Sequence, residues 1–421
     1  MAARASSRRD WKWARAALAL AVLLPLQGGP ARADCLCGPA ADELTADRAG
    51  LEREWLVQIP FDASTATLEH LVIDRDLVVA QTGDGNVVAV RAGEPKAGAP
   101  LPGTILWKHP LDAQSTPFQP AGIGSEIVAV SHGDGIHAFD RTTGQALWSS
   151  RFGLLADAGA TVSGPWVYAP FGDGKIMRLP TNPHRQPATA DEAPAKKDSA
   201  PAKKQSAKKK GRSGAPRPES LEPLALDAGG VVSQQPQPFN GGVLWCTEDG
   251  ALVVINRGEE DWRRNDFFLD ARPAGRPLVH DGGIFAATAE GDLVRIDELE
   301  IAGGGLRLTW RVFLDTRPEG PLFVSGDKLV VSLGDDGIAV FSTKTGEQLG
   351  RTWRHGRIVA VTAGRIWLVD RIGRLVSLDL ETGEVRDRLC LGGFTFPVAN
   401  QSTDRLILAS PSGAIVSFKA K

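Results

Sequence analysis

The sequence IVAVSHGDGIHAFDRTTGQALWSSRF, from Ile127 to Phe152, predicts three consecutive strands of one antiparallel sheet. Apolar residues alternate with others on both sides of Gly133-Asp134-Gly135, which is typical of half-buried strands joined by a tight turn. Glycine and aspartate tolerate the positive φ angles that such turns require. A second turn at Thr143-Gly144 then leads to a strand that contains Trp148.

The same pattern recurs along the chain and places a turn glycine at eight positions. These are Gly85, Gly135, Gly174, Gly250, Gly291, Gly337, Gly373 and Gly413. Neighbouring turn glycines are 36 to 50 residues apart, except for one step of 76 between Gly174 and Gly250. A period of about 40 to 50 residues is typical of the four-stranded blades of β-propellers. The sequence therefore predicts an all-β fold, an eight-bladed β-propeller of four-stranded antiparallel blades.

The long step contains a segment of different composition, 182–220, which has scarcely any large apolar residue. Without these 39 residues the step shortens to 37 and fits the period. We therefore expect a disordered insertion rich in lysine, proline and alanine. Its position in the repeat predicts that it interrupts the link between the third and outer strands of blade three, on the side opposite the glycine turns.

The insertion is strongly basic. Between His184 and Pro218, ten lysine and arginine residues outnumber three acidic ones, a net charge of +7, and the rest of the chain after residue 33 carries −14. Such a segment is a candidate tether for anionic lipid or an acidic polymer, and the alternative is a solvated loop without a partner. It has no aromatic residue for base stacking, so nucleic acid is the least favoured partner. The candidate tether residues are Lys196, Lys197, Lys203, Lys204, Lys208, Lys209, Lys210 and Arg212.

Both ends of the chain are expected to share the last blade. The sequence stops after the third strand of the eighth repeat, Ala414 to Phe418, and Glu54–Ile59 is an additional strand before the first repeat. Pairing of these two would close a propeller over 54–421 and remove the exposed edges that favour aggregation. We expect the tryptophans of the outer strands to pack between blades. These are Trp55, Trp107, Trp148, Trp310 and Trp353.

The first 33 residues have the features of a secretory signal peptide. Basic residues precede an apolar run of 11 residues from Ala16 to Leu26, and Ala31-Arg32-Ala33 is typical of a cleavage site. A membrane-spanning helix needs about 20 apolar residues, so a retained anchor is the weaker alternative. We expect cleavage after Ala33, a flexible segment 34–53, and a soluble exported protein in the periplasm or outside the cell.

Four cysteines, Cys35, Cys37, Cys246 and Cys390, are available for disulfides in an exported protein. Their spacing leaves the pairing open. Cys246 and Cys390 each stand alone within a predicted strand, and we expect both to be small buried hydrophobic residues.

The segment Ala138–Trp148 closely matches the pattern A-x-D-x-x-T-G-x-x-x-W, and Val340–Gly346 and Ser377–Gly383 match it in part. This pattern resembles the repeats of the pyrroloquinoline-quinone-like (PQQ-like) propeller superfamily over about 55–418. The order of elements is similar to that of BamB-type propellers of the outer-membrane barrel-assembly machinery. The chain departs from those lipoproteins because Asp34, and not a small neutral residue, precedes Cys35. The resemblance implies a propeller scaffold that binds an envelope protein.

The resemblance also includes quinoprotein dehydrogenases, which hold their cofactor with Ca²⁺ and, in the alcohol dehydrogenases, against two adjacent cysteines. This sequence has no adjacent cysteine pair. Aspartates in the turns are candidate calcium ligands, but an aspartate that caps its own turn explains each of them. They are Asp84, Asp134, Asp173, Asp249 and Asp335. We therefore predict a non-enzymatic scaffold without catalytic, cofactor or metal residues, with a quinone- and calcium-dependent dehydrogenase as the alternative.

Overall fold

The computed structural model describes residues 42–111, 118–182, 223–257, 262–299, 304–362 and 364–421. All of them belong to the second of the two compact units into which the chain divides, Cys37–Lys421. The predicted signal peptide, 1–33, lies outside the described residues. The predicted insertion, 182–220, lies outside them as well, except for Asn182 at its start.

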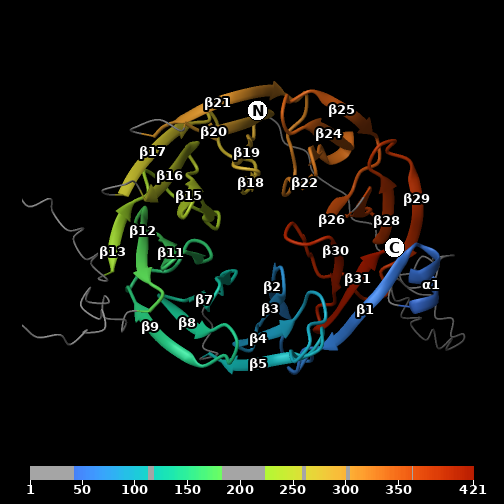
Figure 1. Cartoon of the computed structure of the whole chain (residues 1–421), viewed down its shortest axis with the longest axis horizontal. Coiled ribbons are helices and arrows are strands. Elements are labelled where there is room, and N and C mark those ends of the chain that lie inside the picture. Colours follow the sequence, from blue (N-terminus) through green and yellow to red (C-terminus); the bar gives the residue numbers. More distant parts are fainter. Residues whose placement is uncertain (1–41, 112–117, 183–222, 258–261, 300–303, 363) are drawn as a thin grey trace, which may run out of the picture. The chain divides into compact units, whose positions relative to one another are not determined.

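The strands form eight antiparallel sheets, which Figure 1 shows one after another around a closed circle. Seven of the sheets contain four strands that pair in chain order, and we number them blades one to seven from the N-terminal side. This confirms the predicted eight-bladed β-propeller. In Figure 1 the fourth strand of each of these blades lies outermost, and the first strands that are labelled, those of blades one, five, six and seven, lie toward the centre.

The first four blades have the following strands. Blade one contains β2 (Leu68–Asp74), β3 (Leu77–Thr82), β4 (Asn86–Arg91) and β5 (Ile105–Pro110); blade two contains β6 (Gly122–Ile123), β7 (Ile127–His132), β8 (Gly135–Asp140) and β9 (Ala146–Arg151). Blade three contains β10 (Thr161–Ser163), β11 (Trp166–Phe171), β12 (Lys175–Pro180) and β13 (Leu224–Asp227); blade four contains β14 (Gln237–Phe239), β15 (Gly242–Cys246), β16 (Ala251–Arg257) and β17 (Trp262–Phe268).

The remaining blades follow the same order. Blade five contains β18 (Leu278–His280), β19 (Gly283–Ala287), β20 (Asp292–Glu298) and β21 (Leu306–Phe313); blade six contains β22 (Phe323–Ser325), β23 (Lys328–Ser332), β24 (Ile338–Ser342) and β25 (Gln348–Thr352), with the short 3-10 helix η1 (Gly334–Asp336) between β23 and β24. Blade seven contains β26 (Arg357–Thr362), β27 (Arg365–Val369), β28 (Arg374–Asp379) and β29 (Val385–Cys390).

Blade eight is built from both ends of the described chain. Its three strands are β30 (Arg405–Ala409), β31 (Ala414–Ala420) and, in the outer position, β1 (Leu51–Gln58). The innermost strand is reduced to a single bridge between Phe396 and Ala409. Trp55 pairs with Ser417, two residues from Ile415, so the predicted closure of the ring by the N-terminal strand is confirmed.

The core follows from the sequence pattern of the strands. Second and third strands are apolar on both faces because a neighbouring blade covers each face, and β3 and β11 are buried at every residue. Outer strands such as β9 and β17 alternate between exposed and less exposed residues. Eight clusters of buried apolar side chains result, one at each junction between neighbouring blades.

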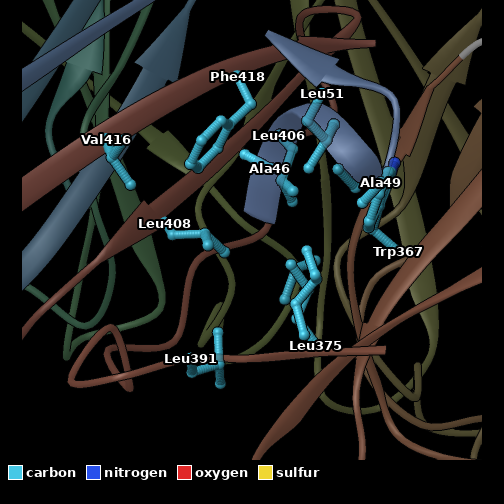
Figure 2. Close-up of a cluster of buried hydrophobic side chains, with 13 residues drawn as sticks. Ala46, Ala49, Leu51, Trp367, Leu375, Leu391, Leu406, Leu408, Val416 and Phe418 are labelled. Atoms are coloured by element: carbon cyan, nitrogen blue, oxygen red, sulfur yellow. The ribbon is translucent and has the colours of Figure 1, made fainter. Parts of the chain in front are cut away.

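A short helix, α1 (Glu43–Arg48), precedes β1 and packs at the junction of blades seven and eight. Figure 2 shows Ala46, Ala49 and Leu51 in one cluster with Trp367 of blade seven and Phe418 of blade eight. Segment 34–53 was expected to be flexible, and from Asp42 onward the structure differs from this expectation. The physical reason is that these small and apolar residues cover a core that blade eight would otherwise expose.

The chain leaves blade three where the insertion was predicted. Strand β12 ends at Pro180, and its partner β13 begins at Leu224. Pro180 pairs with Trp166, at the end of the sheet opposite the turn between Phe171 and Lys175. The described ends of the segment therefore confirm both the predicted link and the side on which it leaves the sheet.

The two cysteines in strands differ from each other. Cys246 is a free buried thiol, as expected, and burial raises its pKa to about 12. Cys390, at the end of β29, is disulfide-bonded, so the prediction of an unpaired buried residue is wrong for this position. Its exposure explains the difference, because Cys390 is only partly buried at the end of an outer strand. No helix among the described residues is long and apolar enough to cross a membrane.

Candidate functional site

Seven of the eight predicted turn glycines lie between the second and third strands of their blades, at what we call the turn end of each sheet. Seven of the eight have positive φ angles, from 73° to 98°. In blade two the positive φ, 58°, occurs at Gly133, and Gly135 instead begins β8. At Gly250 a Cβ atom would lie 2.5 Å from the carbonyl oxygen of Ala271, so a side chain is excluded on steric grounds as well.

Three of the five predicted turn aspartates, Asp84, Asp173 and Asp335, contact neighbouring side chains. Asp84 Oδ1 accepts a hydrogen bond from the Thr82 hydroxyl at 2.5 Å. Partial burial raises the pKa of Asp84, but the hydrogen bonds from Thr82 and Asn86 outweigh this effect, so the pKa lies below its usual range. Asp173 pairs with Lys175 at 2.7 Å, and Asp335 pairs with Arg371. Among the residues that the structure describes, no group of three or more His, Cys, Asp or Glu side chains is placed to hold a metal ion.

A second set of aspartates caps the turns between third and outer strands. Asp140 Oδ1 accepts the backbone N–H groups of Thr142 and Thr143 at 3.0 and 2.7 Å. The hydrogen bond from Thr143 is the main reason that the pKa of Asp140 is lowered. Asp379 accepts the N–H groups of Thr382 and Glu381 in the same way, and Arg386 lowers its pKa further. The aspartate and threonine of the repeated pattern therefore form the turn.

Three of the five predicted tryptophans dock on the next blade by one shared contact. Trp107 Nε1 donates a hydrogen bond to Arg141 O at 2.9 Å, Trp148 Nε1 to Thr181 O at 3.0 Å, and Trp310 Nε1 to Thr343 O at 3.0 Å. Each acceptor follows the third strand of the neighbouring blade. Where that turn contains the Thr-Gly pair, the glycine lies under the indole: a Cβ at Gly144 would be 2.5 Å from Trp107 ring atoms.

Trp353 does not pack between blades, and its prediction as an inter-blade residue is wrong. Its side chain is 71% exposed, and it lies just beyond the end of β25. The position that faces the next blade is occupied by Gly350, which pairs with Val340 directly beside the β-bulge, as Trp107 pairs with Ala89 in blade one. Trp353 therefore lies three residues past the packing position, where outer-strand side chains point to solvent.

The junction between blades seven and eight replaces tryptophan with a charged pair. Asp387 takes the position beside the bulge of β29, and Arg365 Nη1 contacts it at 3.2 Å. The same guanidinium donates a hydrogen bond to Ala49 O at 2.7 Å. Ala49 and Gly50 therefore occupy the position that the Thr-Gly turn has in other blades. Lys421 N donates to Gly50 O at 2.9 Å and completes the turn without a covalent link. Trp55 on β1 is 6% exposed and packs against Gly103 of blade one.

The innermost strands enclose a polar space. Two cavities of about 370 and 270 Å³ are both lined by Gln235, Arg276, Gln401 and Ser402. Gln235 donates to the carbonyl oxygens of Ala121 and Ala160, at 3.1 and 2.6 Å, and ties three blades together. Burial lowers the pKa of Arg276 to about 10, so this side chain keeps its charge at neutral pH. These groups satisfy backbone carbonyls at the inner ends of the blades.

Two further cavities open at the turn ends of blades six and seven. One of about 410 Å³ is lined by Glu319, Asp335, His355, Arg357 and Arg371, among others. The second, of about 260 Å³, has apolar walls from Trp353, Leu368, Ile372, Val376 and Val385, and its charged lining residues are Arg354, Asp370, Arg371, Arg374 and Arg388. His355 and Arg371 line both, so the two cavities adjoin.

Comparison with known proteins places this architecture in a family. The sequence profile of the family described as "Outer membrane protein assembly factor BamB" matches residues 80–181 and 248–395, which is more than half of the chain. The chain belongs to the BamB family. Its two matched segments lie on either side of the predicted insertion. No curated protein sequence matches the chain.

Solved structures share the fold. The crystal structure of BamB from Moraxella catarrhalis is similar with a TM-score of 0.60 and 17% sequence identity, over 88% of this chain and 98% of that one. The computationally designed Ika8 protein is similar with a TM-score of 0.57 and 15% identity, over 87% of this chain and 99% of that one. At these identities the likeness establishes the propeller fold alone.

The predicted tether residues, Lys196 to Arg212, lie outside the described residues. Sequence reasoning missed the cavities of blades six and seven, although one signal pointed to them. The repeat places tryptophan four residues after the turn glycine, as in Gly144 and Trp148, whereas Trp353 follows Gly346 by seven. A tryptophan outside the packing position, next to Arg354 and His355, indicates a surface residue.

Proposed function

We propose that this BamB-family protein is a non-enzymatic scaffold of the cell envelope that assists the assembly of outer-membrane proteins by binding a component of the barrel-assembly machinery. The observation that supports the proposal most is the family match over both sides of the propeller, together with a complete ring of eight blades. A closed ring presents its loops in fixed positions, so binding costs little conformational entropy.

The proposed site of action requires export. We propose that residues 1–33 direct the chain across the inner membrane and are removed after Ala33, which leaves a soluble periplasmic protein. The intact mass of protein isolated from the periplasm tests this step. A mature chain that begins at Asp34 is the expected result, and retention of residues 1–33 in the isolated protein contradicts it.

The scaffold role is tested by cross-linking in intact cells of the source organism, followed by affinity purification of the tagged full-length protein. We expect a barrel-assembly component among the cross-linked proteins and reduced amounts of outer-membrane barrel proteins when the gene is deleted. The enzymatic alternative has its own measurement. Dye-linked alcohol oxidation by the purified protein with pyrroloquinoline quinone and Ca²⁺ would contradict a purely non-enzymatic role.

The basic insertion is proposed to be an electrostatic tether for an anionic surface. Its charge of +7 lies between His184 and Pro218, within a chain that is otherwise acidic. We expect the mature protein to bind vesicles that contain phosphatidylglycerol, more weakly as salt increases. A variant that lacks residues 182–220 should lose this binding, and unchanged or salt-insensitive binding contradicts the tether.

A further inference from the structure

Blades six and seven carry an exposed apolar surface beside their turn-end cavities. Trp353 is 71% exposed and Ile372 is 65% exposed, and both line the cavity of about 260 Å³. Large apolar side chains with this exposure, gathered around a cavity, are typical of surfaces that bind a protein partner. The turn of blade seven, Arg371-Ile372-Gly373, presents Ile372 at the mouth of this cavity.

The indole of Trp353 is held in place although it is exposed. The guanidinium of Arg351 lies over its ring, 4.6 Å from the ring centroid. A cation–π contact of this kind restricts the side chain before a partner arrives, and a restricted side chain loses less entropy on binding. Trp353 is therefore a preorganised aromatic anchor.

The exposed aromatic position is shared by neighbouring blades. Phe313 follows the packing residue Trp310 by three positions, as Trp353 follows Gly350, and Phe313 is 70% exposed. Phe268 ends the outer strand of blade four opposite Ala251, as Phe313 ends that of blade five opposite Asp292, and it is 66% exposed. Blades four, five and six thus each present one aromatic side chain at the turn end of the outer strand.

The charge of this surface differs from that of the rest of the propeller. Four arginines and one aspartate line the cavity of Trp353, whereas the chain after residue 33 has a charge of −14 outside His184–Pro218. Arg374 pairs with Asp370 and Arg371 pairs with Asp335. Arg354 and Arg388 form no ion pair with any residue that the structure describes. Two cations are therefore left beside an apolar cavity, which suits an acidic ligand.

We propose that this region, the Trp353 surface, binds an acidic segment of a protein partner that also carries apolar side chains. The Trp353 surface consists of Trp353, Arg354, Leu368, Arg371, Ile372 and Arg388. Carboxylates of the segment pair with Arg354 and Arg388, and an apolar side chain enters the cavity against Trp353 and Leu368. A flat lipid head-group surface would meet the arginines but would leave this cavity unfilled. The inference rests on the proposed scaffold function, since it assigns a docking surface to it.

The test uses the mature full-length protein and a fluorescein-labelled peptide of alternating glutamate and leucine. Matched peptides replace glutamate with lysine, or leucine with serine. We expect the acidic and apolar peptide alone to bind, as measured by fluorescence anisotropy, with weaker binding at high salt. Trp353→Ala, and separately the double variant Arg354→Gln with Arg388→Gln, should weaken binding by about tenfold or more.

Two control variants remove a similar group elsewhere. Leu101→Ala removes an apolar side chain that is 71% exposed, and Arg307→Gln removes an exposed arginine at the other end of β21. Both should bind the peptide as the wild type does. Equal affinity in all variants, absence of peptide binding, or binding of phosphatidylglycerol vesicles but not peptide through Trp353 overturns the proposal. Self-association that depends on Trp353 without peptide binding overturns it as well.

The scaffold proposal and the surface fail in different ways. If cross-linking recovers the barrel-assembly component with wild type and with the Trp353→Ala variant alike, the scaffold function stands and the Trp353 surface is wrong. If the wild type recovers no such component while the peptide binds through Trp353, the surface stands and the partner class of the proposed function is wrong.

Discussion

Trp310 and Trp353 stand in the outer strands of neighbouring blades, or just after them, and have opposite roles. Trp310 is 9% exposed, donates to Thr343 O at 3.0 Å and lies over Gly346 of the next blade. Trp353 is 71% exposed and contacts Arg351 from its own strand. Residue type is identical, so the position relative to the β-bulge decides whether the indole becomes core or surface.

The difference shows how a repeat protein makes a distinctive site. A bulge reverses the direction of the side chains that follow it, so a shift along the strand moves a side chain from the packed face to solvent. In blade six the packing position is Gly350, and Thr352 takes over the contact with the next turn: a Cβ at Gly383 would lie 2.9 Å from Thr352 Cβ. Blade six thereby gives up an aromatic contact and gains an exposed aromatic ring.

Removal of the buried Trp310 side chain is expected to destabilise the protein most. Trp310→Ala should lower the free energy of unfolding by about 3–5 kcal/mol, because it leaves a cavity between two blades and removes a buried hydrogen bond. Trp353→Ala should change it by less than about 0.5 kcal/mol. Urea unfolding of both variants followed by circular dichroism is the measurement. Similar losses in the two variants would contradict the assignment of core and surface.

A smaller loss is expected from the turn that Trp310 covers. A Cβ at Gly346 would lie 2.8 Å from the Trp310 ring, at a φ of 74°, so Gly346→Ala should cost about 2–4 kcal/mol through overlap and backbone strain. Gly241 has the same φ of 74° and open space around its Cβ position. Gly241→Ala should therefore cost only about 1 kcal/mol. Unfolding midpoints in urea separate the two, and equal shifts would mean that packing against Trp310 is unimportant.

The junction between blades seven and eight has a charged pair where some other junctions have a tryptophan. Arg365 links Asp387 to Ala49 across blades seven and eight, and Arg365→Ala should cost about 1.5–3 kcal/mol through the loss of charge-assisted hydrogen bonds. It should also make the N-terminal strand more accessible to limited proteolysis. The exposed Arg307 is the control, since Arg307→Ala should leave both stability and the cleavage pattern unchanged. If Arg365→Ala does not change the cleavage pattern, then the contacts of Arg365 with Asp387 and Ala49 do not hold the N-terminal strand in place.

The smallest effect concerns the turns on which the tryptophans dock. Asp140 caps the turn under Trp107 as a carboxylate, and Ser342 caps the turn under Trp310 with a hydroxyl that does not titrate. The pKa of Asp140 is lower in the folded protein than in the unfolded chain, so its contribution is present above the unfolded pKa of about 3.9 and is lost as pH falls through the folded pKa.

Asp140→Ala should therefore cost about 0.5–1 kcal/mol at pH 7, and this cost should shrink below about pH 4. Ser342→Ala should show a cost that does not depend on pH. Thermal unfolding of both variants between pH 7 and pH 3 checks the pair. A constant cost for Asp140→Ala would mean that the carboxylate is not the group that stabilises the turn.

From the amino-acid sequence we could predict the fold class, the number of blades, the closure by Glu54–Ile59 and the place of the insertion. This was possible because every blade has the same local sequence pattern, a glycine turn between two apolar strands, and the spacing of this pattern can be counted. The prediction named aspartates in the glycine turns and missed Asp140, which caps the turn within its own segment.

Three features became visible only in the folded protein: which tryptophans are buried, how α1 and Arg365 complete blade eight, and that Arg354 and Arg388 adjoin Trp353 at one cavity. These features depend on bulge positions and on contacts between blades that are distant in sequence. Ala49 and Arg365 are 316 residues apart, so no local pattern could have joined them. Packing between blades brings together residues that are distant in sequence, and this packing determines which side chains of each blade are exposed.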